Sequence, residues 1–197
     1  GGPVGGGVIQ GTASESTLCA MIAARDGAIE RLAARGEHGW AGRVAAYTST
    51  QAHSSVIKAA QVCGVGRDMV RLIETDSHLA MDAGALERAI REDIGRGIEP
   101  PAFVCATLGT TSTGAMDPLL EIARATREHA PDAWLHVDAA WAGSAFACPE
   151  LRGPLEGVER YDSYVFNPHK WLLTNFDCSA FYVNGADARR RLIESMS

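Results

Sequence analysis

Apolar residues recur along the chain in two patterns, one typical of helices and the other of buried strands. Leu18, Ile22, Ile29 and Leu32 follow one another at roughly helical spacing, which predicts a helix up to about residue 34. Short apolar runs without that spacing predict strands. The expected strands are residues 44–48, 69–73, 102–108, 134–137, 161–166 and 179–183, and the expected helices are residues 12–34, 54–63, 85–94, 118–129 and 186–196.

Strands that alternate with helices predict parallel crossover connections. The expected fold is therefore α/β, with a mostly parallel central sheet flanked by helices. In such sheets a ligand lies at the carboxyl ends of the strands. The polar residues expected to line one crevice there are Thr110, Thr111, Asp138, Asn167, His169 and Lys170.

The chain opens with a run rich in glycine, residues 1–7, which is interpreted as a loop or flexible linker. Thr12 and Glu15 then have the spacing of a capping box, so a helix is expected to begin there. Ala13 and Ser14 would present free N–H groups and a hydroxyl at that helix start, which favours a phosphate. An ordinary cap is the alternative, because capping serves every helix.

Composition narrows the classes of function. The 197 residues allow one domain or slightly more, and a net charge of -6 argues against a nucleic-acid partner. No apolar run approaches a membrane span and no signal-peptide pattern opens the chain, so a cytoplasmic protein with small-molecule chemistry is expected. The five scattered cysteines, mostly among apolar neighbours, suit reduced, buried thiols.

Lys170 and Asp138 are the candidate catalytic pair. A lysine amine can form a Schiff base with an aldehyde cofactor, and a carboxylate can keep a pyridine nitrogen protonated. Lys170 precedes the apolar residues 171–173, so partial burial is expected, with a surface lysine as the alternative. Asp138 ends an apolar strand, where it needs either a cationic partner or backbone N–H groups.

Three further positions are ambiguous by themselves. His53 follows a strand and opens a helix, so its ring could stack on a flat cofactor or serve as a cap. Thr110 and Thr111 could line the crevice or form a turn. His136 lies two residues before Asp138, but no third and fourth ligands have suitable spacing, so no metal site is predicted.

Seven short segments follow one another along nearly the whole chain. They are Thr12-Ala13-Ser14-Glu15, Gln51-Ala52-His53-Ser54-Ser55, Thr107-Leu108-Gly109-Thr110-Thr111, His136-Val137-Asp138-Ala139-Ala140, Ala142-Gly143-Ser144-Ala145-Phe146, Asn167-Pro168-His169-Lys170-Trp171 and Asn175-Phe176-Asp177-Cys178-Ser179-Ala180. Together they closely resemble the group II pyridoxal-phosphate-dependent decarboxylases, most strongly the aromatic-L-amino-acid decarboxylase branch. The resemblance implies that residues 1–197 are part of the large domain of a fold-type I enzyme, usually a homodimer, without an upstream segment and a C-terminal small domain.

The resemblance also implies roles for individual residues. Lys170 would be the Schiff-base lysine, Asp138 would pair with the pyridine nitrogen of pyridoxal 5'-phosphate (PLP), and His53 would stack on the ring. The other implied roles are phosphate binding by Ala13, Ser14 and Asn167, completion of the cofactor pocket by Thr111 and Ala140, and a place beside the lysine–cofactor bond for His169.

The implied activity is decarboxylation of an aromatic L-amino acid to an amine and carbon dioxide. Two alternatives stay open: an aromatic aldehyde synthase of the same family, and a catalytically silent piece that serves only cofactor binding or assembly. Trp141 stands where many relatives have tyrosine. The mobile-loop tyrosine of the family would fall beyond residue 197, so the chain is expected to be a piece of a longer protein and to release little carbon dioxide alone.

Overall fold

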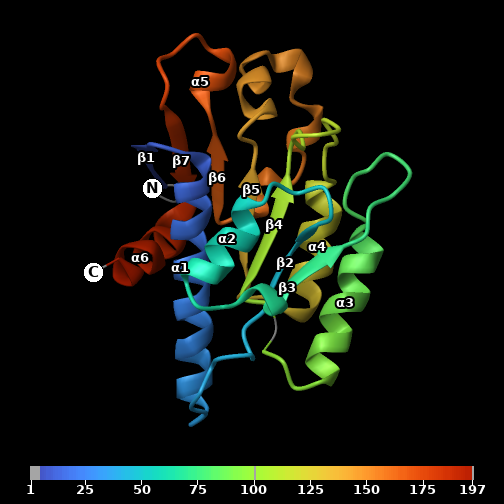
Figure 1. Cartoon of the computed structure of the whole chain (residues 1–197), viewed down its shortest axis with the longest axis vertical. Helices are drawn as coiled ribbons and strands as arrows, with labels where there is room; N and C mark the ends of the chain where they lie inside the picture. Colours follow the sequence, from blue (N-terminus) through green and yellow to red (C-terminus); the bar gives the residue numbers. More distant parts are fainter. Residues whose placement is uncertain (1–4, 100, 197) are drawn as a thin grey trace.

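The computed structural model describes residues 5–99 and 101–196, which form one sheet between two layers of helices (Figure 1). No helix in these ranges is long and apolar enough to cross a membrane. The strands are β1 (Gly6–Gln10), β2 (Ala46–Ser49), β3 (Val70–Ile73), β4 (Phe103–Thr107), β5 (Trp134–Asp138), β6 (Ser163–Phe166) and β7 (Ser179–Val183). The helices are α1 (Ala13–Ala34), α2 (Ser55–Val62), α3 (Ala83–Gly95), α4 (Leu119–His129), α5 (Pro168–Trp171) and α6 (Gly185–Ser195).

The sheet has the strand order β1-β7-β6-β5-β4-β2-β3. From β3 to β6 all neighbouring strands are parallel, which confirms the mostly parallel α/β sheet. The expected parallel crossover fails at β7, which is antiparallel to both β6 and β1. The connection between β6 and β7 contains only the four-residue α5, which is too short to cover a face of the sheet and return the chain in parallel.

The glycine-rich start contains a strand that the sequence pattern did not predict. Gly6–Gln10 pairs with β7, and Val8 lies opposite Phe181. The loop interpretation is therefore wrong for residues 6–10, while residues 1–4 lie outside the described part of the chain. Glycine has little strand preference of its own, so the backbone ladder with β7 accounts for this strand.

Two apolar cores lie on the two faces of the sheet. Strands β4 and β5 are buried along their whole length, so alternate residues enter opposite cores. The core under α1, α2 and α6 contains Phe103, Cys105, Trp134, Val165, Phe181 and Ala188. The core under α3 and α4 contains Val104, Leu135, Val137, Leu86, Ile90 and Ile122.

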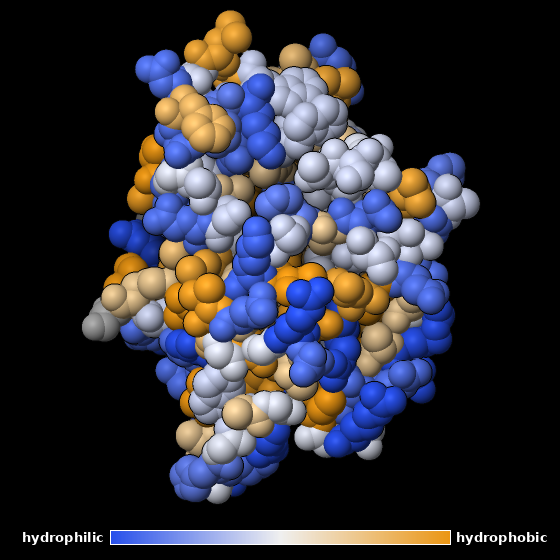
Figure 2. Space-filling view, in the orientation of Figure 1, coloured by the Kyte–Doolittle hydropathy of each residue, from blue (hydrophilic) through white to orange (hydrophobic). Residues whose placement is uncertain are grey.

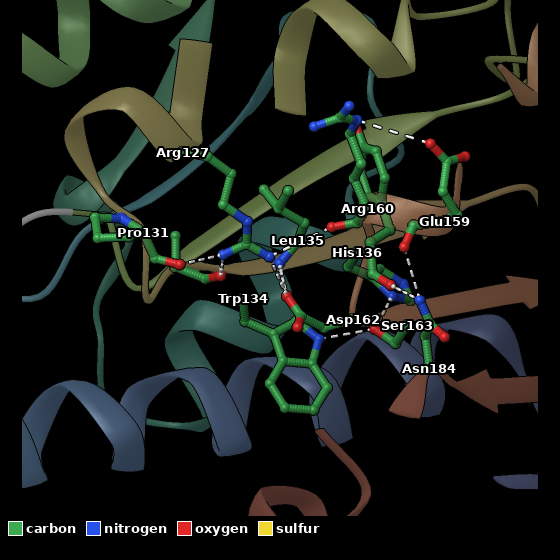
Figure 3. Close-up of polar contacts among 12 residues, drawn as sticks. Arg127, Pro131, Trp134, Leu135, His136, Glu159, Arg160, Asp162, Ser163 and Asn184 are labelled. Atoms are coloured by element: carbon green, nitrogen blue, oxygen red, sulfur yellow. Dashed lines mark hydrogen bonds and ion pairs between the residues drawn. The ribbon is translucent and has the colours of Figure 1, made fainter. Parts of the chain in front are cut away.

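Polar side chains fix the amino ends of β5 and β6 relative to each other (Figure 3). Arg127 of α4 donates to the carbonyl oxygens of Pro131 and Ala133, each at 2.6 Å, and to Asp162 Oδ2 at 3.0 Å. Asp162 Oδ2 also accepts from Leu135 N at 2.8 Å. Because β5 is only five residues long, this anchor also sets the position of its carboxyl end.

A single hydroxyl joins two buried aromatic side chains in the same region (Figure 3). Ser163 Oγ accepts from Trp134 Nε1 at 2.7 Å and lies 2.8 Å from His136 Nδ1. The His136 ring lies beside those of Phe103 and Phe181 and is fully buried, which lowers its pKa to about 3. His136 is therefore a neutral residue of the core at physiological pH.

The five cysteines are all free thiols. Cys63 and Cys105 are buried as expected, and burial raises the pKa of both. Cys148 is exposed, so the expectation of buried thiols is wrong at that position. Cys148 immediately precedes a 3₁₀ turn at Pro149–Leu151, which lies at the surface and provides no apolar cover.

Candidate active site

A cavity of about 230 Å³ lies at the carboxyl ends of the parallel strands. It is lined by the start of α1, the turn before α2, the segments that follow β4 and β5, and α5 with the loop after it. In Figure 1 this is the upper end of the sheet, toward which β4 points. Every residue given a role by the family resemblance lines this cavity: Ala13, Ser14, His53, Thr111, Asp138, Ala140, Asn167, His169 and Lys170.

The start of α1 has the predicted Thr12 cap, but Glu15 bonds to the residue before the cap and not to Thr12 N as a capping box requires. Thr12 Oγ1 accepts from Glu15 N at 3.1 Å, and Glu15 Oε2 accepts from Gly11 N at 3.1 Å. The N–H groups of Ala13 and Ser14 have no acceptor within the helix, because they belong to its first turn. The cap and an anion site are therefore compatible, since the cap leaves these donors and the exposed Ser14 hydroxyl available at the cavity.

Asp138 is a buried carboxylate at the end of β5, with 5% of its surface exposed. Its Oδ1 accepts from Ala140 N at 3.0 Å, and no bond joins its other oxygen to a described residue. Burial raises the pKa of Asp138, while the Ala140 N–H and the charges of Lys170 and His53 act in the opposite direction. A cation placed against this carboxylate in the cavity would favour its ionised form.

Lys170 lies on α5, one turn of helix that begins just after β6 ends. The expected partial burial of Lys170 is wrong, because this turn lies at the surface and the side chain is exposed. Its apolar neighbours are exposed as well, with 46% of Leu172 and 99% of Leu173 accessible. Figure 2 shows hydrophobic surface at this upper end of the molecule.

The two histidines of the cavity are held in the same way. His53 Nδ1 accepts from Ser55 N at 3.2 Å, so the ring caps the approach to α2 while it also lines the cavity. His169 Nδ1 accepts from Cys178 N at 2.9 Å, and its ring centroid lies 4.5 Å from that of Phe176. When each ring is neutral, these bonds place its proton on Nε2.

The two adjacent threonines after β4 have different positions. Thr110 is 2% exposed, and its hydroxyl accepts from Ala115 N at 3.0 Å and lies 2.6 Å from Thr113 Oγ1. Thr110 is therefore a turn residue, and the expectation that it lines the crevice is wrong. Thr111 lines the cavity.

Asn167 is the buried residue between β6 and α5. Its Oδ1 accepts from Ser179 Oγ at 2.5 Å, and its backbone N–H donates to Ala140 O at 3.2 Å. With the carbonyl of its side chain engaged by Ser179, the amide nitrogen remains as a donor at the cavity.

Sequence reasoning missed several cavity residues, among them Thr107 and Trp141. Trp141 is 42% exposed, and its ring centroid lies 5.0 Å from that of Trp171, so the two indoles form one apolar wall. Thr107 was hidden because the strand was expected to end at Leu108. Its place at the carboxyl end of a buried strand was the signal that could have found it.

Residues 1–192 match the family described as the pyridoxal-dependent decarboxylase conserved domain. The chain belongs to this family. The sequence is 52% identical over 184 residues to aromatic-L-amino-acid decarboxylase of Cavia porcellus, a match that covers 91% of the chain and 37% of that relative. The chain thus spans little more than a third of the length of the aromatic-L-amino-acid and tryptophan decarboxylases that it matches.

Solved structures give the same fold for this chain. It superimposes on Oryza sativa TDC with PLP and tryptamine with a TM-score of 0.90 and 43% identity, covering 98% of the chain and 38% of that structure. The TM-score with Rhodiola rosea 4-hydroxyphenylacetaldehyde synthase is 0.89 at 38% identity, covering 98% of the chain and 40% of that structure. The fold-type I large-domain architecture is therefore established for these residues.

Proposed function

We propose that the chain is the PLP-binding core of an enzyme that decarboxylates an aromatic L-amino acid to the corresponding amine and carbon dioxide. One observation carries the proposal: an amine, Lys170, a buried carboxylate, Asp138, and the helix start at Ser14 all line one cavity. PLP presents an aldehyde, a pyridine nitrogen and a phosphate, so each part of the cofactor has a matching group. The family membership and the names of the relatives support this reading.

The donor set fits the cofactor by charge as well as by type. The α1 N-terminus and the Asn167 amide supply N–H donors for a dianionic phosphate. Asp138 has no bonded cationic partner among the residues that the structure describes, and a protonated pyridine nitrogen would provide one. When bound, PLP supplies an electron sink for the charge left at the substrate carbon after carbon dioxide departs.

The residues of this chain would then divide the work. Lys170 would hold PLP through its amine, a group that can form a Schiff base with an aldehyde. Asp138 would hold the ring nitrogen in its protonated form, and His53 would lie against the ring. His169, next to Lys170 in α5, would donate through Nε2 near the Lys170 amine.

An aromatic side chain on the substrate suits the wall of the cavity. Trp141 and Phe176 line the cavity, and Trp171 packs against Trp141 at its edge. Offset or edge-to-face contacts with such rings favour aromatic groups over aliphatic ones. The relatives named for aromatic amino acids and for tryptophan support the same substrate class.

A second candidate is an aromatic aldehyde synthase, which the likeness to the Rhodiola rosea enzyme favours. The two activities differ in product, because the synthase oxidatively deaminates the substrate as well as decarboxylating it. Analysis of the products from dopa, tyrosine or tryptophan by mass separates them. An amine supports the decarboxylase, and an aldehyde supports the synthase.

A homodimer in the cytoplasm is part of the proposal. Leu172, Leu173 and Phe176 are 46%, 99% and 81% exposed beside the cavity, and apolar surface of this kind suits contact with a second copy. The free cysteines favour a reducing compartment. Sedimentation velocity tests the dimer, with and without PLP.

Covalent labelling tests the cofactor site directly. The chain contains two lysines, Lys58 and Lys170, and both are exposed. After incubation with PLP and reduction by borohydride, peptide mapping should find the label on Lys170, because the cavity holds the phosphate and ring there. Lys58→Ala is expected to keep the label and Lys170→Ala to lose it. Equal labelling of the two lysines would refute a specific site.

A further inference from the structure

Thr107 has a buried hydroxyl that the proposed mechanism does not use. It is the last residue of β4, is 4% exposed and lines the cavity. Its Oγ1 has no hydrogen-bond partner among the residues that the structure describes. Leaving a buried hydroxyl unpaired costs stability, so a position that keeps one next to a cavity points to a partner supplied when the site is filled.

The backbone of Thr107 is fixed more firmly than a strand end requires. Asp117 Oδ2 accepts from Thr107 N at 2.7 Å, and Asp117 N donates to Thr107 O at 3.0 Å. The other oxygen of Asp117 accepts from Met81 N at 2.7 Å. These bonds hold the backbone of Thr107 from the side of the loop after β4, so its Cβ has a fixed place at the cavity.

The register of the sheet places Thr107 beside Asp138. The two residues are direct partners across the parallel pair β4 and β5, whose backbones lie roughly 4.8 Å apart. Leu108 N donates to Asp138 O at 2.9 Å, which fixes this register at the cavity. Ala140 N occupies only one carboxylate oxygen of Asp138.

We propose that Thr107 is a positioning residue, whose hydroxyl donates to the free carboxylate oxygen of Asp138 when PLP fills the cavity. This inference rests on the proposed function. The hydroxyl and the Ala140 N–H then hold the carboxylate from two sides and direct it at the pyridine nitrogen. A donor to the ionised form also offsets the effect of burial, which raises the pKa of Asp138.

The charge of Asp138 responds to a small set of neighbours. The titratable groups that face it are His53 before α2, Cys105 on β4, and His169 and Lys170 on α5. None of them is changed by a substitution at position 107. A shift in the pH dependence of cofactor binding in such a variant therefore reports on the hydroxyl itself.

The test uses the purified chain with PLP as the probe and measures affinity from the absorbance of the lysine-bound cofactor across pH. Thr107→Val keeps the shape of the side chain and removes the donor. We expect the dissociation constant of PLP to rise about tenfold, because hydrogen bonds to charged groups contribute at that level. We also expect the acid limit, which is the pH below which PLP binding is lost, to be about one pH unit higher. Thr107→Ser, which restores a hydroxyl, should restore both values.

Thr126→Val is the matched control. Thr126 Oγ1 is also buried without a partner among the described residues, but it lies on α4 and away from the cavity. This variant should bind PLP as the original chain does, with the same acid limit. Its urea unfolding curve calibrates the general effect of losing a buried hydroxyl.

The outcomes separate the inference from the proposed function. If the unchanged chain forms no borohydride-stable link at Lys170, the proposed function fails. If that link forms and Thr107→Val binds PLP with unchanged affinity and acid limit, the positioning role is wrong. A Thr107→Ser variant as weak as Thr107→Val would overturn it too, because the effect would then come from packing and not from the hydroxyl.

Discussion

Gly109 follows β4 at the cavity, and replacing it with alanine tests how tightly this loop is packed. Its φ is +83°, in the left-handed region that disfavours side chains. A Cβ at this position would lie 2.8 Å from both Ala142 Cβ and Trp141 Cε3. The backbone strain costs about 1–2 kcal/mol and the overpacking about 1–3 kcal/mol, so Gly109→Ala should lose about 2–5 kcal/mol of unfolding free energy.

Gly114 provides the control, because it has the strain without the crowding. Its φ is +70°, and a Cβ there would meet only Trp141 Cζ3, at 4.0 Å. Gly114→Ala should lose about 1–2 kcal/mol. Urea unfolding followed by circular dichroism gives both values, and melting should fall by about 2–4 °C per kcal/mol for a chain of this size. Equal losses in the two variants would refute the packing argument.

Three other substitutions test separate features. Thr12→Ala removes the α1 cap and should lower the unfolding free energy, measured in urea, by about 0.5–2 kcal/mol. The control is Ser54→Ala, at a helix start without a side-chain cap bond, which should lower it by almost nothing. Similar losses in the two variants would contradict the role of the cap. Asp93→Ala removes the buried carboxylate that accepts from Tyr47 Oη at 2.7 Å and pairs with Arg71 Nε at 2.6 Å, and it should cost about 3–5 kcal/mol; a loss under about 1 kcal/mol would show that the site relaxes easily. His136→Phe should make the unfolding free energy depend less on pH below about pH 6.5. The reason is that burial lowers the pKa of His136 to about 3, whereas its ordinary value is about 6.5. The neutral ring stabilises the fold fully above about pH 6.5, and this contribution is lost as pH falls toward 3, by up to about 1.4 kcal/mol per pH unit. Unfolding measured from pH 7 to pH 4 should show the difference in slope, and parallel curves would contradict it.

Parts of the sheet and of the cavity could be predicted from the sequence, namely those that depend only on residues close together in the chain. The apolar runs of β4 and β5 are short and rich in strand-forming residues, which favours buried strands, and Asp138 is the first charged residue after the run of β5. The α1 cap is likewise encoded by Thr12 and Glu15 alone. The structure brings the predicted site residues together, while their individual roles stay predictions.

Other features depend on contacts that no local pattern contains. The pairing of Gly6–Gln10 depends on β7, which lies at the other end of the chain. Thr110 and Thr111 are chemically identical, and only the turn decides that one is buried and the other faces the cavity. The exposure of Lys170 depends on the single-turn length of α5, which residue types near it do not indicate.

The elements that line the cavity connect to two parts of the sheet, the antiparallel edge pair β1 and β7 and the parallel strands. The start of α1 follows directly from β1, and α5 with Lys170 leads into β7, so both connect to this edge of the sheet. Asp138 ends β5 and His53 follows β2, so both connect to the parallel part. A ligand that contacts both parts would act as a cross-link, and amide hydrogen exchange in Gly6–Gln10 should slow when it binds. The edge ladder would then report occupancy of a cavity that its own side chains do not line.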